Sequence, residues 1–293
     1  MIYQVTHKTR YEYADAVPLS HNLVRMRPRE HSGQTCRWHE LRVTPSPAVQ
    51  YDLLDYFGNS TCWLSLEEPH TQLLVESKSE VDVRLELRPD PSQGSSWEHV
   101  RQMIAAPLGR EITAVRQFVF DSVHVKRSPI LAAYALASFS LERPLLECVL
   151  GLTKQIHRDF EYLPGSTKVG TPSLEVLETR RGVCQDFAHL GIACLRSLGL
   201  AARYVSGYIA TTSPPGKPRL TGVDASHAWM SVFSPDFGWV DFDPTNGIVP
   251  LDSHITVAWG RDYDDVGPIR GVLVGGQWQR LQVNVDVIPA ESA

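Results

Sequence analysis

Cys184 is the residue of this chain whose surroundings best suit a nucleophile. It opens the segment 183–198, in which apolar residues recur every three or four positions, the pattern of an amphipathic helix. A thiol in the first turn of a helix faces unpaired backbone N–H groups and the positive end of the helix dipole, and both favour the thiolate. Arg180 and Arg181 would strengthen this effect if their guanidinium groups point toward the sulfur. The competing interpretation is a small buried apolar residue, which is how we interpret Cys194 on the apolar stripe of the same segment.

His227 lies at the start of a segment that predicts a hairpin. Residues 227–233 alternate as in a half-buried strand, a turn of five residues follows, and 239–243 form a second strand. If the two residues that flank the turn pair with each other, His227 and Asp243 are diagonal neighbours on one face, about 7–8 Å apart at the backbone. An imidazole and a carboxylate can form a hydrogen bond at that separation. A shift of one residue would put them on opposite faces, so this inference depends on the register.

The cysteine, the histidine and the aspartate together supply a nucleophile, a base and a group that orients the base. Asp241 shares the face of Asp243 but lies farther from His227, so it is the weaker candidate for the third position. A lone histidine is more often a hydrogen-bonded structural residue, whereas a histidine with an aspartate placed in this way favours catalysis. A metal site built from Cys184 and His227 would lack a close pair of ligands, and we expect no metal.

The elements that precede this region predict a small antiparallel β-sandwich. Alternating residues run from Tyr3 to Tyr13, and 51–66 has the pattern of a hairpin. Proline and glycine separate these and other short runs at the spacing of a sandwich. The segment 88–96, with two prolines, one glycine and three serines, then predicts a linker. We therefore expect an N-terminal β-sandwich domain over residues 1–90.

The remaining residues, 91–293, predict an α+β domain. Helical patterns precede and include the cysteine-bearing segment, and alternating strands follow it up to a final pair around Gly275-Gly276. The predicted helices cover 111–123, 144–160, 172–180 and 183–198. Between the predicted strands, 212–220 is rich in proline and reads as an exposed loop that precedes His227. Asp262, Asp264 and Asp265 are interpreted as a solvated charge run rather than a calcium site.

Composition narrows the possible partners and the compartment. The 293 residues carry 28 basic and 33 acidic side chains, a net charge of −5, and no long basic run, so we expect neither nucleic acid nor a membrane surface as a partner. The first residues mix charged and aromatic side chains, unlike a signal peptide, which leads us to expect a cytoplasmic protein. The 5 cysteines are scattered, which predicts reduced thiols rather than a disulfide framework or a metal knuckle.

Three short motifs carry a resemblance to a known family. Arg181–Phe187 (RGVCQDF), His227–Trp229 (HAW) and Gly238–Thr245 (GWVDFDPT) resemble the three signatures of the transglutaminase-like superfamily, and they occur in the same order. The segment Asp159–Gly165 and the upstream strands resemble the bacterial branch of that superfamily, which carries an N-terminal β domain. The motif core covers about residues 150–250. Three spaced motifs are far more specific than any one of them alone.

This resemblance implies a papain-like core in which the helix bearing the cysteine packs on an antiparallel sheet. It assigns Cys184, His227 and Asp243 as a catalytic triad and makes 91–293 the catalytic domain. It also implies an aromatic donor upstream of the cysteine for the oxyanion, for which Tyr162 is the candidate. No cofactor is implied.

The implied reaction is acyl transfer from a carboxamide or peptide bond of a protein or peptide substrate. The thiolate would form a thioester, which then passes to water or to an amine. The protein would therefore be a hydrolase (a cysteine protease or amidase) or a protein-glutamine acyltransferase. The alternative is a non-catalytic protein- or peptide-binding module that retains the fold, and the intact set of three residues argues against it. The oligomeric state is left open.

Overall fold

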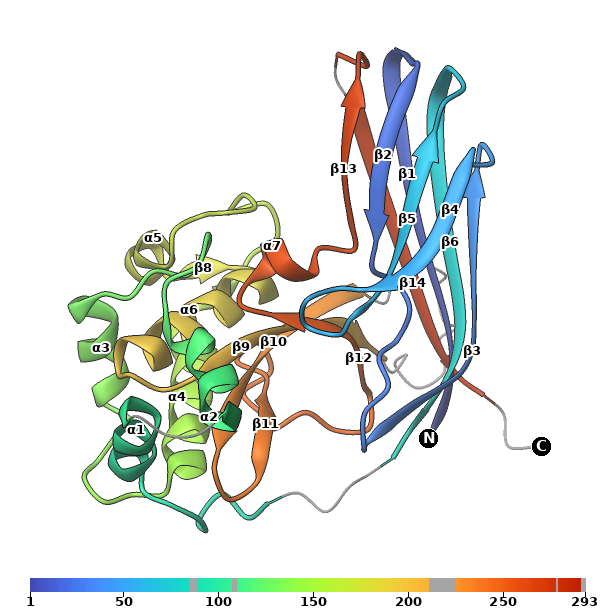
Figure 1. Ribbon diagram of the computed structural model, residues 1–293. Helices are drawn as coiled ribbons and strands as arrows, with labels where there is room; N and C mark the ends of the chain where they lie inside the picture. The colour runs from blue at the N-terminus through green and yellow to red at the C-terminus, as the bar shows by residue number, and fades with distance from the viewer. Residues whose placement is uncertain (85–88, 107–109, 211–224, 278, 291–293) are drawn as a thin grey trace, which may run out of the picture.

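The protein joins a tall β-sandwich to a helix-covered sheet (Figure 1). The computed structural model describes residues 1–84, 89–106, 110–210, 225–277 and 279–290. The predicted loop 212–220 and the first residue of the predicted linker lie outside these ranges. None of the described helices is long and apolar enough to cross a membrane.

The sandwich consists of two antiparallel sheets of four strands each, in the orders β14-β1-β6-β3 and β13-β2-β5-β4. Its strands alternate as predicted: along β1, the side chains from Tyr3 to Thr9 on one face are buried while those between them are exposed or half-buried. On that face, Tyr3 and Val5 join the apolar core of the second unit. The strands from the first part of the chain are β1 (Ile2–Val17), β2 (Leu19–Val24), β3 (Gln34–Thr44), β4 (Val49–Leu54), β5 (Ser60–Leu66) and β6 (His70–Val83). The predicted sandwich is therefore present.

The last two strands of the chain belong to the sandwich as well. β13 (Ile269–Val274) pairs with β2, and β14 (Gln279–Pro289) pairs with β1 over its whole length. Figure 1 shows these two red strands beside the blue N-terminal ones. The boundary expected near residue 90 placed both strands in the second domain, and their pairing corrects this. Alternation identified them as strands, but it carries no information on which distant strand is the partner.

The second unit is α+β, as the sequence predicts. Its sheet has the order β11-β10-β9-β12 and is antiparallel. Figure 1 shows the helices gathered on one side of this sheet and the sandwich on the other. The helices are α1 (Trp97–Ala105), α2 (Arg110–Arg116), η1 (Gln117–Val119), α3 (Pro129–Leu136), α4 (Leu145–Asp159), α5 (Ser173–Thr179), α6 (Cys184–Ser197) and α7 (Tyr263–Val266). The strands are β7 (Glu161–Tyr162), β8 (Arg181–Gly182), β9 (Ala202–Ile209), β10 (Ala225–Ser234), β11 (Gly238–Phe242) and β12 (His254–Gly260).

Helix α6 lies at the centre of this unit, packed against β9 and β10. Its residues from Asp186 to Arg196 are all buried, so its position is fixed on every side. Gly191 permits the close approach to the sheet, because a Cβ there would lie 2.4 Å from the sulfur of Met230 on β10. The first residue of this tightly held helix is Cys184.

Side chains of the sandwich complete the edge strand of the second sheet. The Gln34 amide donates to the carbonyl of Thr256 on β12 at 2.8 Å and accepts from the Thr256 N–H at 2.8 Å. The Asn59 amide makes the same two kinds of contact with the backbone of Trp259, at 2.9 and 3.0 Å. These two amides replace the hydrogen bonds that a further strand would provide, and they hold β12 to the sandwich.

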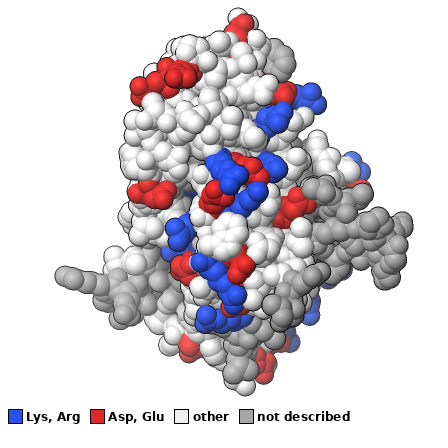
Figure 2. Space-filling model, turned by 90° about the vertical axis from the view of Figure 1, so that its right-hand side faces the viewer, with Lys and Arg blue, Asp and Glu red and all other residues white. Residues whose placement is uncertain are grey.

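The outer surface of the sandwich carries charges of both signs. Exposed ion pairs such as Lys8–Glu76 and Arg37–Asp82 link neighbouring strands. Figure 2, which views the molecule from the side where Figure 1 draws β3, shows acidic and basic side chains interleaved along the middle of this face. Exposed pairs of this kind contribute little to stability, so the buried apolar face holds the sheet.

A pair of adjacent substitutions tests the placement of β14. Val287 is fully buried, whereas Ile288 on the opposite face is 47% exposed. Val287→Asp should lower the free energy of unfolding by on the order of 3 kcal/mol, because it buries an unpaired charge in the apolar core where β14 packs against β9 and β10. Ile288→Asp should change it by no more than about 0.5 kcal/mol. Urea denaturation of the two variants measures this difference, and equal effects would contradict the pairing of β14 with β1.

Candidate active site

The hairpin of β10 and β11 has the register on which the sequence analysis depends. Phe233 pairs with Trp239 across the turn, and the pairing continues to Met230 and Phe242. Odd-numbered residues of the two strands therefore share a face. His227 near the start of β10 and Asp243 just after β11 lie on it together.

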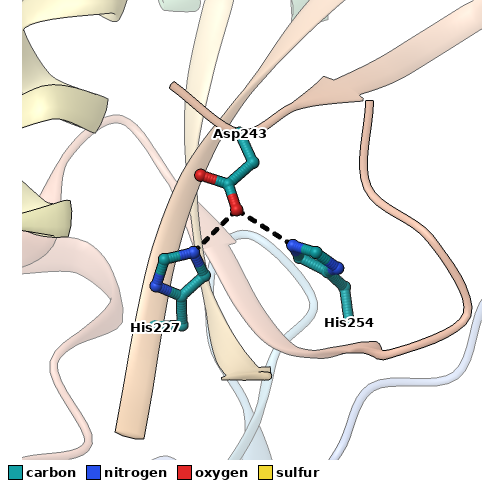
Figure 3. Close-up of side chains that lie close together, drawn as sticks. All are labelled: His227, Asp243 and His254. Atoms are coloured by element: carbon teal, nitrogen blue, oxygen red, sulfur yellow. Dashed lines mark hydrogen bonds and ion pairs between the residues drawn. The ribbon is translucent and has the colours of Figure 1, made fainter. Parts of the chain in front are cut away.

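His227 and Asp243 form the predicted hydrogen bond. The His227 Nε2 lies 2.8 Å from the Asp243 Oδ2, and both side chains are buried (Figure 3). Asp241, the weaker candidate, instead accepts from the indole Nε1 of Trp229 at 2.9 Å. The structure therefore brings Asp243 rather than Asp241 onto His227.

The Asp243 carboxylate is saturated with N–H donors. Its Oδ1 accepts from the backbone N–H groups of Thr245 and Asn246, at 2.9 and 3.2 Å. Its Oδ2 accepts from His227, from the Asn246 side-chain amide at 2.6 Å and from the His254 Nε2 at 3.0 Å. An ionised carboxylate is a pure acceptor, so this surrounding favours the charged form. Burial opposes ionisation, but these hydrogen bonds hold the pKa of Asp243 well below its ordinary value.

The same carboxylate determines the charge of His227. Burial disfavours the imidazolium, yet the hydrogen bonds to Asp243 and to the Cys184 sulfur, together with the negative charges of these two groups, outweigh it and raise the pKa of His227 to about 10. The imidazole is therefore protonated at neutral pH. Because its Nε2 bonds Asp243, its Nδ1 is the nitrogen that remains for the sulfur.

Cys184 occupies the position that the helical pattern predicts. It is the first residue of α6 and is partly exposed, whereas the other cysteines are buried. The Asp186 carboxylate accepts from the Val183 N–H at 2.8 Å and so caps the same end of the helix. The thiol thus lies between solvent, the helix terminus and His227.

The two arginines before the cysteine do not point toward it, so the condition under which they would stabilise the thiolate is not met. Arg181 is exposed and bonds Glu161 at 3.1 Å. Arg180 stacks over the rings of Tyr134 and Phe160, 5.3 and 5.0 Å from their centroids. Each guanidinium points toward a partner of its own, a carboxylate for Arg181 and aromatic rings for Arg180. The position of the two arginines next to Cys184 in the sequence does not reveal these partners.

Tyr162 lies beside the thiol at the surface. It belongs to β7, which runs parallel to β8 just before Cys184, and its side chain is 50% exposed. Burial and then the charge of Cys184 raise the pKa of Tyr162, so its hydroxyl is protonated and able to donate. The fully enclosed Tyr204 on β9 has its pKa raised by the same two causes. The structure brings Tyr162 to the site, while its role there stays a prediction.

Sequence reasoning missed two residues that bind Asp243. Asn246 follows the Asp-Pro-Thr motif, and an Asx-type turn at Asp243 is the signal that could have found it. His254 belongs to β12, which forms the opposite edge of the sheet from β11. No spacing rule connects two strands that do not pair, so the sequence holds no comparable signal for His254.

Within the described residues, His227, Asp243 and His254 form the group best arranged to hold a metal ion. One ligand atom from each lies within 4.8 Å of the others. A metal would need both Nε2 atoms deprotonated and would displace the donors that already fill Oδ2. These hydrogen bonds favour a positioned carboxylate over a metal centre.

The aspartates near α7 are not the solvated charge run expected from the sequence. Asp262 is buried and caps α7 through the Asp264 N–H, and it also accepts from the His124 N–H at 2.8 Å. Asp265 binds Arg261. These carboxylates form hydrogen bonds with nearby groups, and a cluster of acidic residues in the sequence does not reveal such partners.

Comparisons with known proteins agree with this fold. Residues 3–82 match the bacterial transglutaminase-like N-terminal region, and residues 134–244 match the transglutaminase-like superfamily. An uncharacterized protein of Mycobacterium tuberculosis is 41% identical over 99% of this chain and 93% of its own length. An uncharacterized protein of Mycobacterium leprae is 32% identical over 97% of each chain.

Two further likenesses are more distant. A "putative cysteine protease" from Cytophaga hutchinsonii has the same fold, with a TM-score of 0.76 at 22% identity over 100% of this chain and 92% of that one. A protein-glutamine gamma-glutamyltransferase of Pseudomonas aeruginosa is 31% identical over 32% of this chain and 14% of its own length.

A cysteine at the start of a helix that packs on an antiparallel sheet is the arrangement that defines the transglutaminase-like class of fold. Within that class, the chain belongs to the transglutaminase-like superfamily in its bacterial form, with the matching N-terminal region.

The exposure of the cysteines predicts which of them reacts first. Iodoacetamide at neutral pH should modify Cys184 before the other four, because Cys184 alone is partly exposed. Burial also raises the pKa of the Cys62 thiol to about 12 and that of Cys148 to about 11. Peptide mapping by mass spectrometry after short exposures measures the order, and earlier modification of any buried cysteine would contradict this site.

The histidine pKa values predict distinct titrations. His227 should stay protonated through pH 8 and lose its proton only near pH 10, whereas His189, lowered by burial to about 3, should stay neutral. Because the pKa of His227 in the folded state exceeds its ordinary 6.5, its contribution to stability is complete below pH 6.5 and is lost as the pH rises toward 10. NMR of the ring nitrogens measures both titrations. Cys184→Ala should move the His227 titration to lower pH, and an unperturbed midpoint near 6.5 in the wild type would refute the pairing.

Proposed function

We propose that the protein is a cysteine-dependent acyl-transfer enzyme that acts on carboxamide or peptide bonds of a protein or peptide. The observation that carries this proposal is the buried hydrogen bond of 2.8 Å between His227 and Asp243, with the Cys184 thiol as the second partner of the same imidazole. A nucleophile, a proton carrier and an orienting carboxylate are thus in contact in one series.

The first half of the reaction forms a thioester. The Cys184 sulfur, as thiolate, attacks the carbonyl carbon, and the carbonyl electron pair moves onto oxygen. As the C–N bond breaks, the imidazolium of His227 gives its proton to the departing nitrogen, which leaves as ammonia or as an amine. A histidine that is protonated at neutral pH suits this role as a general acid.

The second half transfers the acyl group. Water or a primary amine attacks the thioester carbon, and the now neutral His227 accepts its proton. The C–S bond breaks and restores the thiolate. With water the protein is a protease or an amidase, and with an amine it joins two molecules. The triad serves both outcomes equally, so the groove around it decides between them.

The oxyanion needs donors that are fixed before the reaction. The backbone N–H of Cys184 lies at the helix terminus, and the Tyr162 hydroxyl is the side-chain donor that we assign beside it. Tyr162 is held there by the β7–β8 pairing and by an edge-to-face contact with Phe187, at a centroid distance of 6.4 Å.

The two similar proteins named above have descriptions that correspond to the two possible outcomes of the reaction, hydrolysis and transfer. The Cytophaga structure is described as a "putative cysteine protease", and the Pseudomonas protein is a protein-glutamine gamma-glutamyltransferase. The same triad chemistry accounts for both descriptions. A non-catalytic binding module, the alternative from the sequence, would give no reason to bury an ionised carboxylate under a histidine that carries its own charge. The site therefore supports the enzyme over the module.

Turnover of glutamine-containing peptides tests this proposal. Purified protein, with and without a primary amine such as cadaverine, should release ammonia or cleave peptides, and amine adducts should appear if transfer occurs. His227→Ala should abolish most turnover, because the leaving nitrogen then lacks its proton donor. Asp243→Asn should lower kcat/KM by at least about 10²-fold, because an amide favours the wrong imidazole tautomer.

Asp241→Asn is the matched control. Asp241 accepts one hydrogen bond from Trp229, and an asparagine oxygen can still accept it, so kcat/KM should fall much less than in Asp243→Asn. A larger loss in Asp241→Asn would overturn the assignment of the third residue. Full turnover by Cys184→Ala would overturn the proposed function itself.

A further inference from the structure

Asp243 binds two imidazoles through one oxygen. Its Oδ2 lies 2.8 Å from the Nε2 of His227 and 3.0 Å from the Nε2 of His254 (Figure 3). The catalytic scheme above uses only the first of these histidines. The second needs an explanation, because it places another polar ring in the interior at the same carboxylate.

His254 is held in one orientation. It is 5% exposed, and the indole of Trp229 packs against its ring edge to face, with centroids 5.3 Å apart. The indole reaches this position across Gly207 on β9, where a Cβ would lie 2.5 Å from the Trp229 ring. Packing therefore directs the His254 Nε2 onto Asp243.

The backbone that carries His254 is fixed from the sandwich. Two residues further along β12, Thr256 exchanges two hydrogen bonds with the Gln34 amide and accepts a third from the Arg29 N–H at 3.0 Å. The edge strand therefore cannot drift away from the sheet without breaking these bonds. The sandwich and β12 together fix His254 against the carboxylate.

We propose that His254 is a positioning residue of the acyl-transfer site, whose Nε2–H fixes the Asp243 carboxylate so that its Oδ2 stays on His227. This inference rests on the proposed function. The Nε2–H of His254 approaches Oδ2 from a different side than His227 (Figure 3), and together with the Asn246 amide it opposes rotation of the carboxylate. A carboxylate that rotates would leave the imidazole free to turn away from the sulfur, and the geometry of the proton transfer would be lost.

Two substitutions of His254 separate hydrogen bonding from packing. In His254→Gln, an extended side chain can place an amide N–H near the position of the lost Nε2–H, whereas His254→Met fills space without a donor. We expect His254→Gln to retain kcat within about 3-fold of the wild type. We expect His254→Met to lose about 10- to 100-fold in kcat with little change in KM, since a hydrogen bond to a charged group is lost.

His7→Gln is the matched control for loss of a buried histidine. His7 is 1% exposed and bonds the Tyr208 hydroxyl on β9 at 2.9 Å, and it is not among the donors to Asp243. Its kcat should equal that of the wild type. Equal losses of kcat in His254→Gln and His254→Met, or no loss in either, would overturn the positioning role.

Proton NMR of ¹⁵N-histidine-labelled protein tests the inference independently of turnover. The wild type should show low-field ring N–H signals for both His227 and His254, because each donates to a buried carboxylate. His254→Met should remove one signal and broaden or shift the other, whereas His254→Gln should keep the His227 signal in place. An unchanged His227 signal in His254→Met would overturn the inference even if no substrate were ever turned over. A shifted signal in a protein without thiol-dependent turnover would refute the proposed function and leave the hydrogen-bond role of His254 standing.

Discussion

The burial of the Asp243 carboxylate is the constraint on which the rest of the site depends. An ionised carboxylate without contact to water is costly unless donors replace its hydration, and here five N–H groups do so. These donors come from β10, from the turn after β11 and from β12. The three segments can meet the carboxylate only in one arrangement, so the charge specifies how the end of the sheet is assembled.

The sandwich contributes to this constraint through the edge strand of the helix-covered sheet. β12 is an edge strand, and its backbone is completed by the Gln34 and Asn59 amides of the sandwich. The strands β1 and β14, which lie far apart in the sequence, also pair with each other in the sandwich. Loosening the sandwich would therefore loosen β12 and the donor that it contributes to Asp243. The sandwich acts on the site through hydrogen bonds, at a distance from the sulfur.

Local patterns were sufficient to predict much of the fold and the central part of the site. Period-two alternation located the strands, and parity across the hairpin turn placed Asp243 beside His227, as the 2.8 Å hydrogen bond confirms. The features that these patterns did not predict share one physical cause. The partner strand of β14, the direction of Arg180 and the arrival of His254 from β12 are all determined by contacts between distant segments. Alternation and helical spacing describe neighbours along the chain, and they say nothing about such contacts.

Comparison of the buried histidines shows how strongly one carboxylate can change the pKa of an imidazole. Burial lowers the pKa of His7 to about 4 and that of His189 to about 3, so these rings are neutral acceptors or donors in the interior. His227 is buried to a similar degree, yet its pKa rises to about 10. The difference lies in the negative charges of Asp243 and of the Cys184 sulfur, both of which raise the pKa of His227. A buried imidazolium between an ionised carboxylate and a sulfur is stable only as part of that series, because each charge compensates the burial of the next. Removing any one of the three members would therefore change the charge of the others, which is why we regard them as a single chemical unit.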